Sequence, residues 1–473
     1  MMGVMVSEET RTMPSTHIRS SAGTGTEPAT RTPPTRAWRT RLMVVGIVLA
    51  ALNLRPAIAS LGALLEEVRD GLGMSGSVAG LLTSVPALCF AAFGVMAPRL
   101  ARRFGPGAVV CAGMVAIAAG LAIRPYAGGT PGFLAATALA LMGIAVSNVL
   151  MPVIVKRWFP DRVGSMTGLY SMALALGTSA AAAVTVPMTD ALGGSWRSGL
   201  TVWAGLAAVA VLPWIPLARV RGTVADGSHS TKPATGAGAH STKAATGADS
   251  PAPAIGAESV KPTTGADASR SVADDLRITR SRTAWALAVF FGLQATAAYI
   301  TMGWMAQIFR DAGVSAGTAG LLLAVTMVMG VPLAFVIPRL ATRLPHQGPI
   351  VVALGVCGLA GYAGLYLAPA GGAWAWAVLL GVSNCAFPLA LTMVGMRART
   401  GAGVAKLSAF AQSAGYLLSI PGPLLVGVLY QHSGGWGLPL ALMAALMIPQ
   451  IAVGVVAGRD RTVEDEAARR TQR

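Results

Sequence analysis

The chain has 473 residues, of which 54% are hydrophobic and only 12% are charged. This composition is too apolar for a soluble globular protein of that length, so we expect a polytopic membrane protein. The formal net charge of +17 would also suit a nucleic-acid-binding protein, so the placement of the charges has to decide between the two.

Residues 1–40 are rich in Ser, Thr, Pro and Arg, which is typical of a disordered cytoplasmic tail and not of a cleaved signal peptide. Apolar runs follow, and a run of about 20 residues can cross a bilayer as a helix. We predict twelve spans, at 42–65, 78–100, 108–126, 133–155, 164–188, 200–217, 285–309, 319–340, 350–367, 374–396, 404–430 and 438–456. The alternating pattern of a membrane β-barrel is absent from the sequence.

The basic residues fall almost entirely on one side of the predicted membrane. All of the 36 lysines and arginines lie in predicted cytoplasmic segments, except Arg55, Arg69, Arg124, Arg197 and Arg310. This positive-inside asymmetry predicts both termini in the cytoplasm and an even number of spans in a plasma (inner) membrane. It accounts for the net charge without nucleic acid.

Residues 219–282 differ in character from the sequence on either side. Two stretches, HSTKPATGAGA at 229–239 and HSTKAATGADS at 240–250, consist of residues that cannot form a packed core. We interpret the segment as a low-complexity cytoplasmic linker, with a regulatory binding role as the alternative. It separates a six-helix bundle at 41–218 from a second at 283–457, and a cytoplasmic tail follows at 458–473.

The two predicted bundles share a repeated sequence. SGSVAGLLTSVP from Ser75 aligns without gaps on SAGTAGLLLAVT from Ser315, which pairs Gly80 with Gly320. Because six spans is an even number, the two halves have the same orientation in the membrane. Such parallel repeats are typical of major facilitator transporters, which rock two halves about a central site. No selectivity-filter segment of a channel is visible.

Arg55 stands inside the first predicted span, in LNLRP at 52–56. At 1.5 Å per residue it lies about 20 Å from the start of the span, near the bilayer centre. A charge there costs about 3 kcal/mol, and none of the 19 acidic residues is predicted at the same depth. We therefore expect its guanidinium to bind an anionic or electron-rich solute. The alternative is a structural arginine satisfied by carbonyls and amides.

Other polar side chains in the spans are candidates for the wall of the same central cavity. Asn148 and Asn384 occupy matched positions in the repeat and would face each other, unless each only ties its helix to a neighbour. The remaining candidates are Tyr170, Gln294, Tyr299, Gln412 and Tyr416. Three prolines, Pro56, Pro152 and Pro388, are candidate hinges. Asn53 lies on a different helix face from Arg55 and is expected to bond to a neighbouring helix.

Several residue types carry no predicted chemistry. The cysteines, at 89, 111, 357 and 385, all lie in predicted spans without metal-site spacing, so neither a disulfide, a metal nor a cofactor is expected. Met172, Trp203 and Met327 are expected to contact lipid or other helices. Proton coupling would have to use an acid at a helix end, such as Glu66, Glu67 or Asp190, or the solute itself.

Several stretches resemble a known family. ALNLRPAIASLGALL at 51–65, MPVIVKRWF at 151–159 and NCAFPLAL at 384–391 are similar to the cyanate permease and nitroimidazole transporter family (CynX/NimT) of the major facilitator superfamily. The resemblance covers residues 40–457. It implies an all-α membrane protein with the major facilitator fold, twelve transmembrane helices in two parallel-repeat six-helix halves, and a transporter instead of an enzyme.

Three functions remain open at this point. The first is secondary transport of a small polar or anionic solute such as cyanate, recognised by Arg55. The second is efflux of a nitroimidazole or other drug-like compound, with Arg55 bonded to a nitro group. The third is a membrane sensor that transports nothing. The expected partners are a small-molecule solute and the lipid bilayer, without nucleic acid, and the protein is expected to be a monomer.

Overall fold

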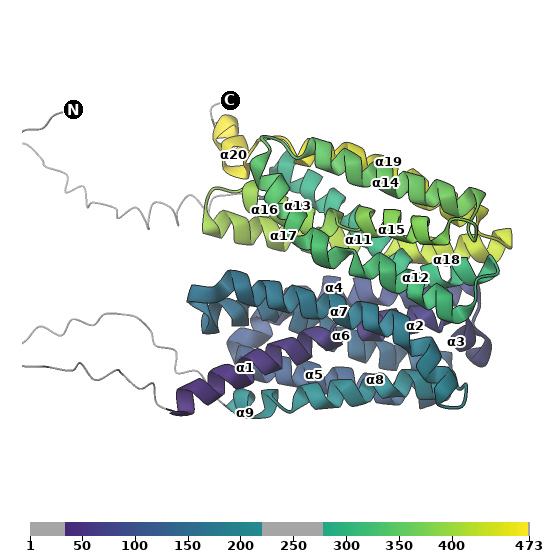
Figure 1. The fold of residues 1–473 in the computed structure, drawn as a ribbon. Helices are drawn as coiled ribbons and strands as arrows, with labels where there is room; N and C mark the ends of the chain where they lie inside the picture. Colours follow the sequence, from purple (N-terminus) through teal and green to yellow (C-terminus); the bar gives the residue numbers. More distant parts are fainter. Residues whose placement is uncertain (1–33, 220–277, 472–473) are drawn as a thin grey trace, which may run out of the picture. The chain divides into compact units, whose positions relative to one another are not determined.

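The computed structural model describes residues 34–219 and 278–471, and these residues form helices joined by short turns, without a strand (Figure 1). The first group of helices is α1 (Pro34–Asn53), α2 (Pro56–Ala63), α3 (Leu65–Leu72), α4 (Gly76–Phe104), α5 (Pro106–Ile123), η1 (Arg124–Tyr126), α6 (Thr130–Trp158), η2 (Pro160–Arg162), α7 (Val163–Ala191), α8 (Trp196–Val211) and α9 (Trp214–Arg219). Nearly all of the predicted linker and most of the predicted N-terminal tail lie outside the described residues.

The second group begins at residue 278. It consists of η3 (Ile278–Arg280), α11 (Arg282–Asp311), α12 (Ala316–Val328), α13 (Gly330–Arg343), α14 (Gly348–Leu367), α15 (Ala373–Ser383), α16 (Ala386–Met396), α17 (Gly401–Ser419), α18 (Pro421–Ser433), α19 (Gly437–Ala457) and α20 (Val463–Thr471). The described residues from Leu42 onward form one compact unit. The α3 end is the end of this unit at α3, and the α20 end is the opposite one (Figure 1).

Eleven stretches of the described chain are long and apolar enough to cross a membrane. They confirm an all-α, multi-pass membrane protein. The predicted sixth span, at 200–217, corresponds to α8 and α9, which are separated by a turn at 212–213. Because Pro213 lacks an N–H and disfavours continued helix, α8 ends after 16 residues and by itself is shorter than a span.

Several spans are interrupted near mid-length. The first span breaks between Asn53 and Pro56, the eighth at Met329, the tenth at 384–385 and the eleventh at Ile420. Two of the helices that follow a break, α2 and α18, begin with proline, which is pre-organised for a first helical position. Interrupted helices are tolerated at membrane depth only where protein or a cavity surrounds them. We therefore expect these breaks to lie in the interior of the protein, beside other helices or a cavity.

The two repeats contact each other most extensively along two pairs of helices, α4 with α18 and α7 with α12. A Cβ added to Gly80 would lie 2.8 Å from the carbonyl oxygen of Leu424, and one added to Gly320 would lie 2.6 Å from that of Ala182. Small residues let membrane helices approach this closely. Since Gly80 and Gly320 are paired positions of the sequence repeat, the repeat supplies the same kind of close contact to both interfaces.

The C-terminal helix α20 is held at the α20 end by acidic residues in its first turn. Glu464 Oε1 accepts hydrogen bonds from the backbone N–H (3.3 Å) and the hydroxyl (3.3 Å) of Thr400. Glu466 accepts from the hydroxyls of Ser281 (2.7 Å) and Thr283 (2.6 Å). These partners stand at the N-termini of α17 and α11, where a carboxylate is favoured by the helix dipole.

Glu466→Gln will loosen the attachment of α20. Burial raises the pKa of the Glu466 carboxyl, but hydrogen bonds from Thr283 and Ser281 outweigh it and hold this pKa below its ordinary value. The ionised carboxylate therefore stabilises the attachment of α20 above about pH 4. This stabilisation is lost as the pH falls through the lowered pKa of Glu466. At pH 7 we expect the variant to exchange the amide hydrogens of α20 about tenfold faster, measured by mass spectrometry.

The matched control for Glu466→Gln is Asp161→Asn, which removes an exposed carboxylate in η2. It should leave exchange in α20 unchanged. Equal exchange rates in α20 for the wild type and Glu466→Gln would show that the carboxylate does not hold this helix.

Candidate functional site

A cavity of about 380 Å³ lies between the two repeats, beside the breaks in the first and tenth spans. Its wall is formed by Arg55 and by residues of α7, α11, α12, α13, α16 and α17, together with the 384–385 turn. Five of the eight predicted binding residues contribute to this wall: Arg55, Gln294, Tyr299, Asn384 and Tyr416. The structure thus brings together residues that are as much as 361 positions apart in the sequence.

Arg55 is the charged residue of the cavity wall. It follows the end of α1 and precedes Pro56, and its backbone (φ −126°, ψ −24°) has left the helical conformation. Within 34–219 and 278–471, its guanidinium makes no ion pair and no hydrogen bond, and the ion pairs of other arginines lie at the two ends of the bundle. No carboxylate of these residues forms an ion pair with Arg55.

Three tyrosines from three helices lie within electrostatic range of Arg55, and two of them, Tyr299 and Tyr416, line the same cavity. The charge of Arg55 acts electrostatically on the phenol groups of Tyr170, Tyr299 and Tyr416. Tyr170 donates its hydroxyl hydrogen to Asn148 Oδ1. The hydroxyls of Tyr299 and Tyr416 make no hydrogen bond to any other described residue, so both can donate to a group bound in the cavity.

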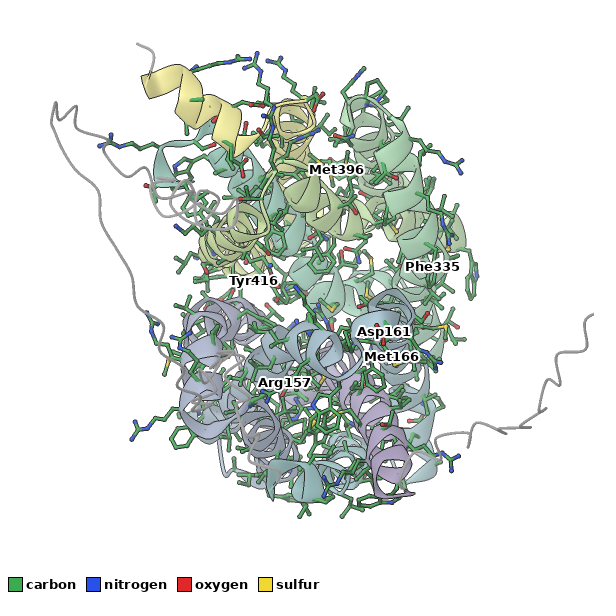
Figure 2. All side chains as sticks on the ribbon, turned by 90° about the vertical axis from the view of Figure 1, so that its left-hand side faces the viewer. Arg157, Asp161, Met166, Phe335, Met396 and Tyr416 are labelled. Carbon is green, nitrogen blue, oxygen red and sulfur yellow. The ribbon has the colours of Figure 1, made fainter. Side chains whose placement is uncertain are left out.

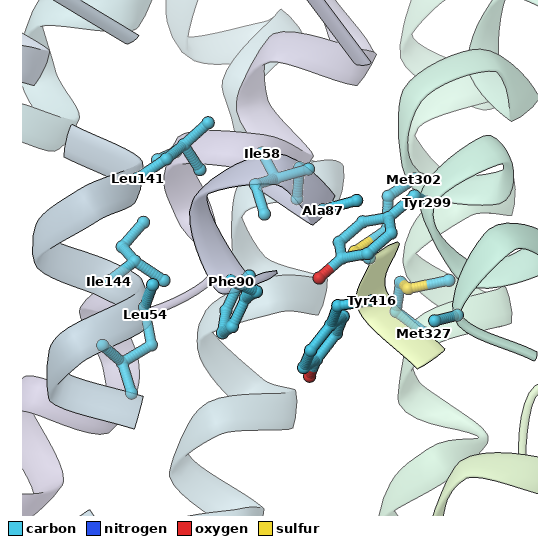
Figure 3. Close-up of a cluster of buried hydrophobic side chains, with 14 of the residues drawn as sticks. Leu54, Ile58, Ala87, Phe90, Leu141, Ile144, Tyr299, Met302, Met327 and Tyr416 are labelled. Carbon is cyan, nitrogen blue, oxygen red and sulfur yellow. The ribbon is translucent and has the colours of Figure 1, made fainter. Parts of the chain in front are cut away.

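Aromatic packing fixes the position of the Tyr416 ring. Phe90 stacks on it with ring centroids 5.0 Å apart, and Phe291 meets it edge-on at 5.1 Å. Figure 3 shows the rings of Phe90, Tyr299 and Tyr416 as neighbours, with Met302 and Met327 on the side of the tyrosines away from Phe90. Because α4, α11 and α17 supply these rings, both repeats hold the two tyrosines in place.

Gln294 and Asn384 form a second polar group in the wall. Gln294 Nε2 donates to the carbonyl oxygen (3.4 Å) and to Oδ1 (3.3 Å) of Asn384. A carbonyl oxygen can only accept, so this contact fixes the orientation of the Gln294 amide. Its other atom, Gln294 Oε1, is buried and has no partner among the described residues. Such an acceptor is stabilised by about 1–3 kcal/mol when water or a bound solute donates to it.

Three predicted binding residues do not line the cavity. Asn148 and Tyr170 bond to each other, and Gln412 Nε2 donates to Ser408 Oγ (2.7 Å) on its own helix. Asn148 and Asn384 differ in their backbone setting, because α6 continues through Asn148 whereas the tenth span breaks at Asn384. Binding roles for the eight residues remain predictions.

The three candidate hinges lie in different settings. Pro56 begins α2 at the break in the first span, and Pro388 follows the break in the tenth span and lines the cavity. Pro152 lies inside the continuous helix α6. Asn53 donates to the Leu206 carbonyl oxygen on α8 (3.4 Å), which confirms its predicted bond to a neighbouring helix.

The apolar part of the wall could not be predicted. Met327, which was expected only to pack against lipid or helices, lines the cavity, as do Leu174, Met302 and Phe387. In the sequence these residues look the same as apolar residues that face lipid. Only the tertiary arrangement distinguishes them.

The α3 end is closed by contacts between the two repeats. Arg310 on α11 lies 2.8 Å from the carboxylates of both Glu66 and Glu67 on α3. Nearby, the Trp304 indole N–H donates to the Thr83 hydroxyl on α4 at 3.1 Å. Two of the acids predicted as possible coupling groups are thus bound to an arginine of the other repeat.

Arg310→Gln will open the α3 end more often. The three side chains are 18–36% exposed, so solvent weakens their attraction and we expect a loss of only about 1 kcal/mol, or a fivefold shift in population. The measurement is the labelling rate of Ala306→Cys, one helical turn from Arg310, by an impermeant thiol reagent in a cysteine-free background. Arg103→Gln, at the exposed opposite end, is the control; equal labelling in both variants would contradict a closing role for Arg310.

A membrane-embedded helical bundle with a cavity between two sequence repeats is the architecture of a solute carrier. Residues 43–419 match the family model of the Major Facilitator Superfamily. The uncharacterized transporter YycB of Bacillus subtilis is 32% identical over 426 residues, covering 89% of this chain and 94% of the relative.

Two relatives from Escherichia coli have assigned solutes. The 2-nitroimidazole transporter is 29% identical, covering 89% of this chain and 96% of its own length. The cyanate transport protein CynX is 26% identical, covering 86% and 94%. This chain therefore belongs to the Major Facilitator Superfamily and, within it, to the cyanate permease and nitroimidazole transporter family, as its sequence motifs predicted. These proteins are transporters of small molecules and not enzymes.

Solved structures share the fold. The xylose transporter XylE from E. coli, in an inward-open conformation, has a TM-score of 0.65 at 11% identity and covers 91% of this chain and 99% of its own. The nucleoside transporter NupG has a TM-score of 0.62 at 12% identity, covering 89% and 98%. At these identities the likeness concerns the major facilitator fold alone.

Proposed function

We propose that this protein is a secondary transporter of a small polar or anionic solute and that Arg55 recognises the solute at the centre of an alternating-access cycle. The observation that carries the proposal is Arg55 at a helix break in the cavity wall, where its guanidinium has no ion-pair or hydrogen-bond partner among the described residues. A charge at this depth requires a partner or water, and a solute that replaces water supplies the partner. The cyanate and 2-nitroimidazole transporters among the relatives fit a small, electron-rich solute.

The same proposal includes orientation and conformation. The positive-inside pattern favours an orientation with the α20 end and both termini in the cytoplasm and the α3 end outside a plasma (inner) membrane. The proposal takes the protein to be a monomer. Contacts of Arg310 close the α3 end. Figure 2, seen from the α20 end, shows Tyr416 between the repeats. The closed α3 end fits the inward-facing stage of the cycle.

Export of a nitroimidazole or another drug-like compound is the second candidate. A volume of about 380 Å³ falls in the range of pockets that bind organic ligands, and most of the wall is apolar. A nitro group would offer two acceptor oxygens to the guanidinium fork.

Uptake into proteoliposomes tests both candidates. Labelled cyanate and labelled 2-nitroimidazole are supplied outside or preloaded inside, and protein-free liposomes are the control. We expect saturable uptake and exchange of at least one small anion or nitro compound. The transport function would be contradicted if neither uptake nor exchange were observed for any solute in a panel of small anions and nitroheterocycles. Circular dichroism must show that the protein used in this test is folded.

A further inference from the structure

The cavity is larger than an inorganic anion requires. Its volume is about 380 Å³, whereas a water molecule in the liquid takes up about 30 Å³, so a three-atom anion such as cyanate fills a small part of it. Apart from its polar groups, the wall is hydrocarbon and thioether, including Leu174, Ala298, Met302, Met327 and Leu391. Covering such surface with an apolar group gains about 25 cal/mol per Å². The cavity therefore fits a solute with an apolar body.

The charge of the wall fits a solute with one negative charge. Arg55 is the charged residue in the wall, and none of the residues described there is acidic. A monoanion neutralises Arg55, while a dianion leaves a second charge uncompensated in a site of low dielectric.

The hydrogen-bond donors near Arg55 fit a carboxylate. The guanidinium offers a planar fork, and the hydroxyls of Tyr299 and Tyr416 are unused by the described protein. A carboxylate has two oxygens that accept about four hydrogen bonds in total. Because Phe90 and Phe291 pack against Tyr416, its ring cannot easily turn aside, and a flat body fits beside it better than a bulky one.

An acceptor stands apart from these donors. Gln294 precedes Tyr299 by five residues on α11, which separates their backbones by about 7.5 Å along the helix axis. That is comparable with the length of one ring with a substituent at each end. The unpartnered Gln294 Oε1 can accept a hydrogen bond from the far substituent.

We propose that the preferred solute is a hydroxylated aromatic monocarboxylate. Its carboxylate binds Arg55 with the Tyr299 and Tyr416 hydroxyls, its ring lies against the apolar wall, and its hydroxyl donates to Gln294 Oε1. This assignment rests on the transport function proposed above and names the solute class of the same cavity.

A ligand series on the purified protein tests the assignment, with dissociation constants measured by calorimetry. The probes are 4-hydroxybenzoate, benzoate, 4-methoxybenzoate, 4-hydroxybenzamide and cyanate. We expect 4-hydroxybenzoate to bind at least tenfold more tightly than cyanate and than the uncharged amide, and about fivefold more tightly than benzoate or 4-methoxybenzoate. Cyanate or the amide binding as tightly as 4-hydroxybenzoate would overturn the assignment.

Two variants locate the ring and the hydroxyl. Gln294→Leu removes the acceptor, so the ratio between benzoate and 4-hydroxybenzoate constants should fall to near one. Ala298→Leu narrows the apolar wall and should weaken both ring compounds more than tenfold, while Ala208→Leu, on the exposed face of α8, should have no effect. If Gln294→Leu left the ratio of the two dissociation constants unchanged, the proposed hydroxyl contact would be wrong. If Ala298→Leu bound both ring compounds as tightly as the wild type, the proposed ring position would be wrong.

Transport and binding separate the two proposals. Uptake of cyanate or 2-nitroimidazole without binding of any aromatic carboxylate leaves the transport function standing and removes the solute class. The expected binding pattern without uptake or exchange of any solute removes the transport function and keeps the site.

Discussion

Arg55→Gln will lower kcat/KM for an anionic solute at least 100-fold. Loss of the charge removes the partner of the bound anion in a cavity of low dielectric, and truncating one member of such a pair costs about 2–5 kcal/mol. Arg55→Lys should keep part of the activity, because the charge remains while the planar fork with its two parallel donors is lost. Initial rates of uptake into proteoliposomes over a range of solute concentrations measure both effects.

The stability of Arg55→Gln separates recognition from a structural role. Since the guanidinium has no partner among the described residues, its removal relieves a charge that costs about 3 kcal/mol at mid-membrane, and the melting temperature should not fall. A structural arginine bonded to carbonyls would behave in the opposite way, with a lower melting temperature and normal solute affinity. Arg103→Gln, on the exposed α20 end, should change neither quantity.

The fold could be predicted because the bilayer imposes strong constraints on a sequence. Apolar runs, one-sided basic charge and the aligned repeat each follow from the need to satisfy backbone groups and to place charges in water. The breaks in the spans were harder. Pro56 and Pro421 directly follow two of the breaks, and Pro332 and Pro388 stand three residues after Met329 and Cys385. Pro86, Pro98 and Pro152, however, lie inside continuous helices, so a proline alone does not predict a break.

The candidate site could be predicted in part for the same physical reason. Polar side chains are costly in lipid, so Arg55, Gln294 and Tyr416 had to face the protein interior, and the structure places them in one wall. Polarity alone does not predict which partner each polar side chain bonds to in the interior. Asn148 and Gln412 are equally polar, but nearby hydroxyls satisfy them away from the cavity.

Close approach at glycines is part of how the repeats meet, and it is tightest at the α3 end. Gly62 on α2 faces the backbone of α11, and an added Cβ would lie closer than 3.0 Å to the carbonyl oxygen of Met302. On the same stretch of α11, a Cβ added to Gly303 would lie 2.6 Å from Thr83 Cγ2. A backbone oxygen cannot move aside as a flexible side chain can. The closed α3 end therefore requires a residue without a side chain, glycine, at position 62.

Gly62→Ala will therefore disfavour the conformation in which the α3 end is closed. In a carrier that alternates between two conformations, we expect the variant to populate the one open at the α3 end, and turnover to fall at least tenfold because the return step is blocked. Ala306→Cys, one helical turn from Met302, should be labelled severalfold faster by an impermeant thiol reagent. Solute binding from the open side should persist.

The control variant is Gly205→Ala on α8, where an added Cβ would meet no atom within 4 Å. The extra methyl group has the same effect on helix propensity there, so a shared loss of turnover would be due to helix stability instead of the interface. Normal turnover and slow labelling in Gly62→Ala would contradict a closing role for the contact at Gly62. Slow turnover with fast labelling would place the closing contact between the repeats at this glycine.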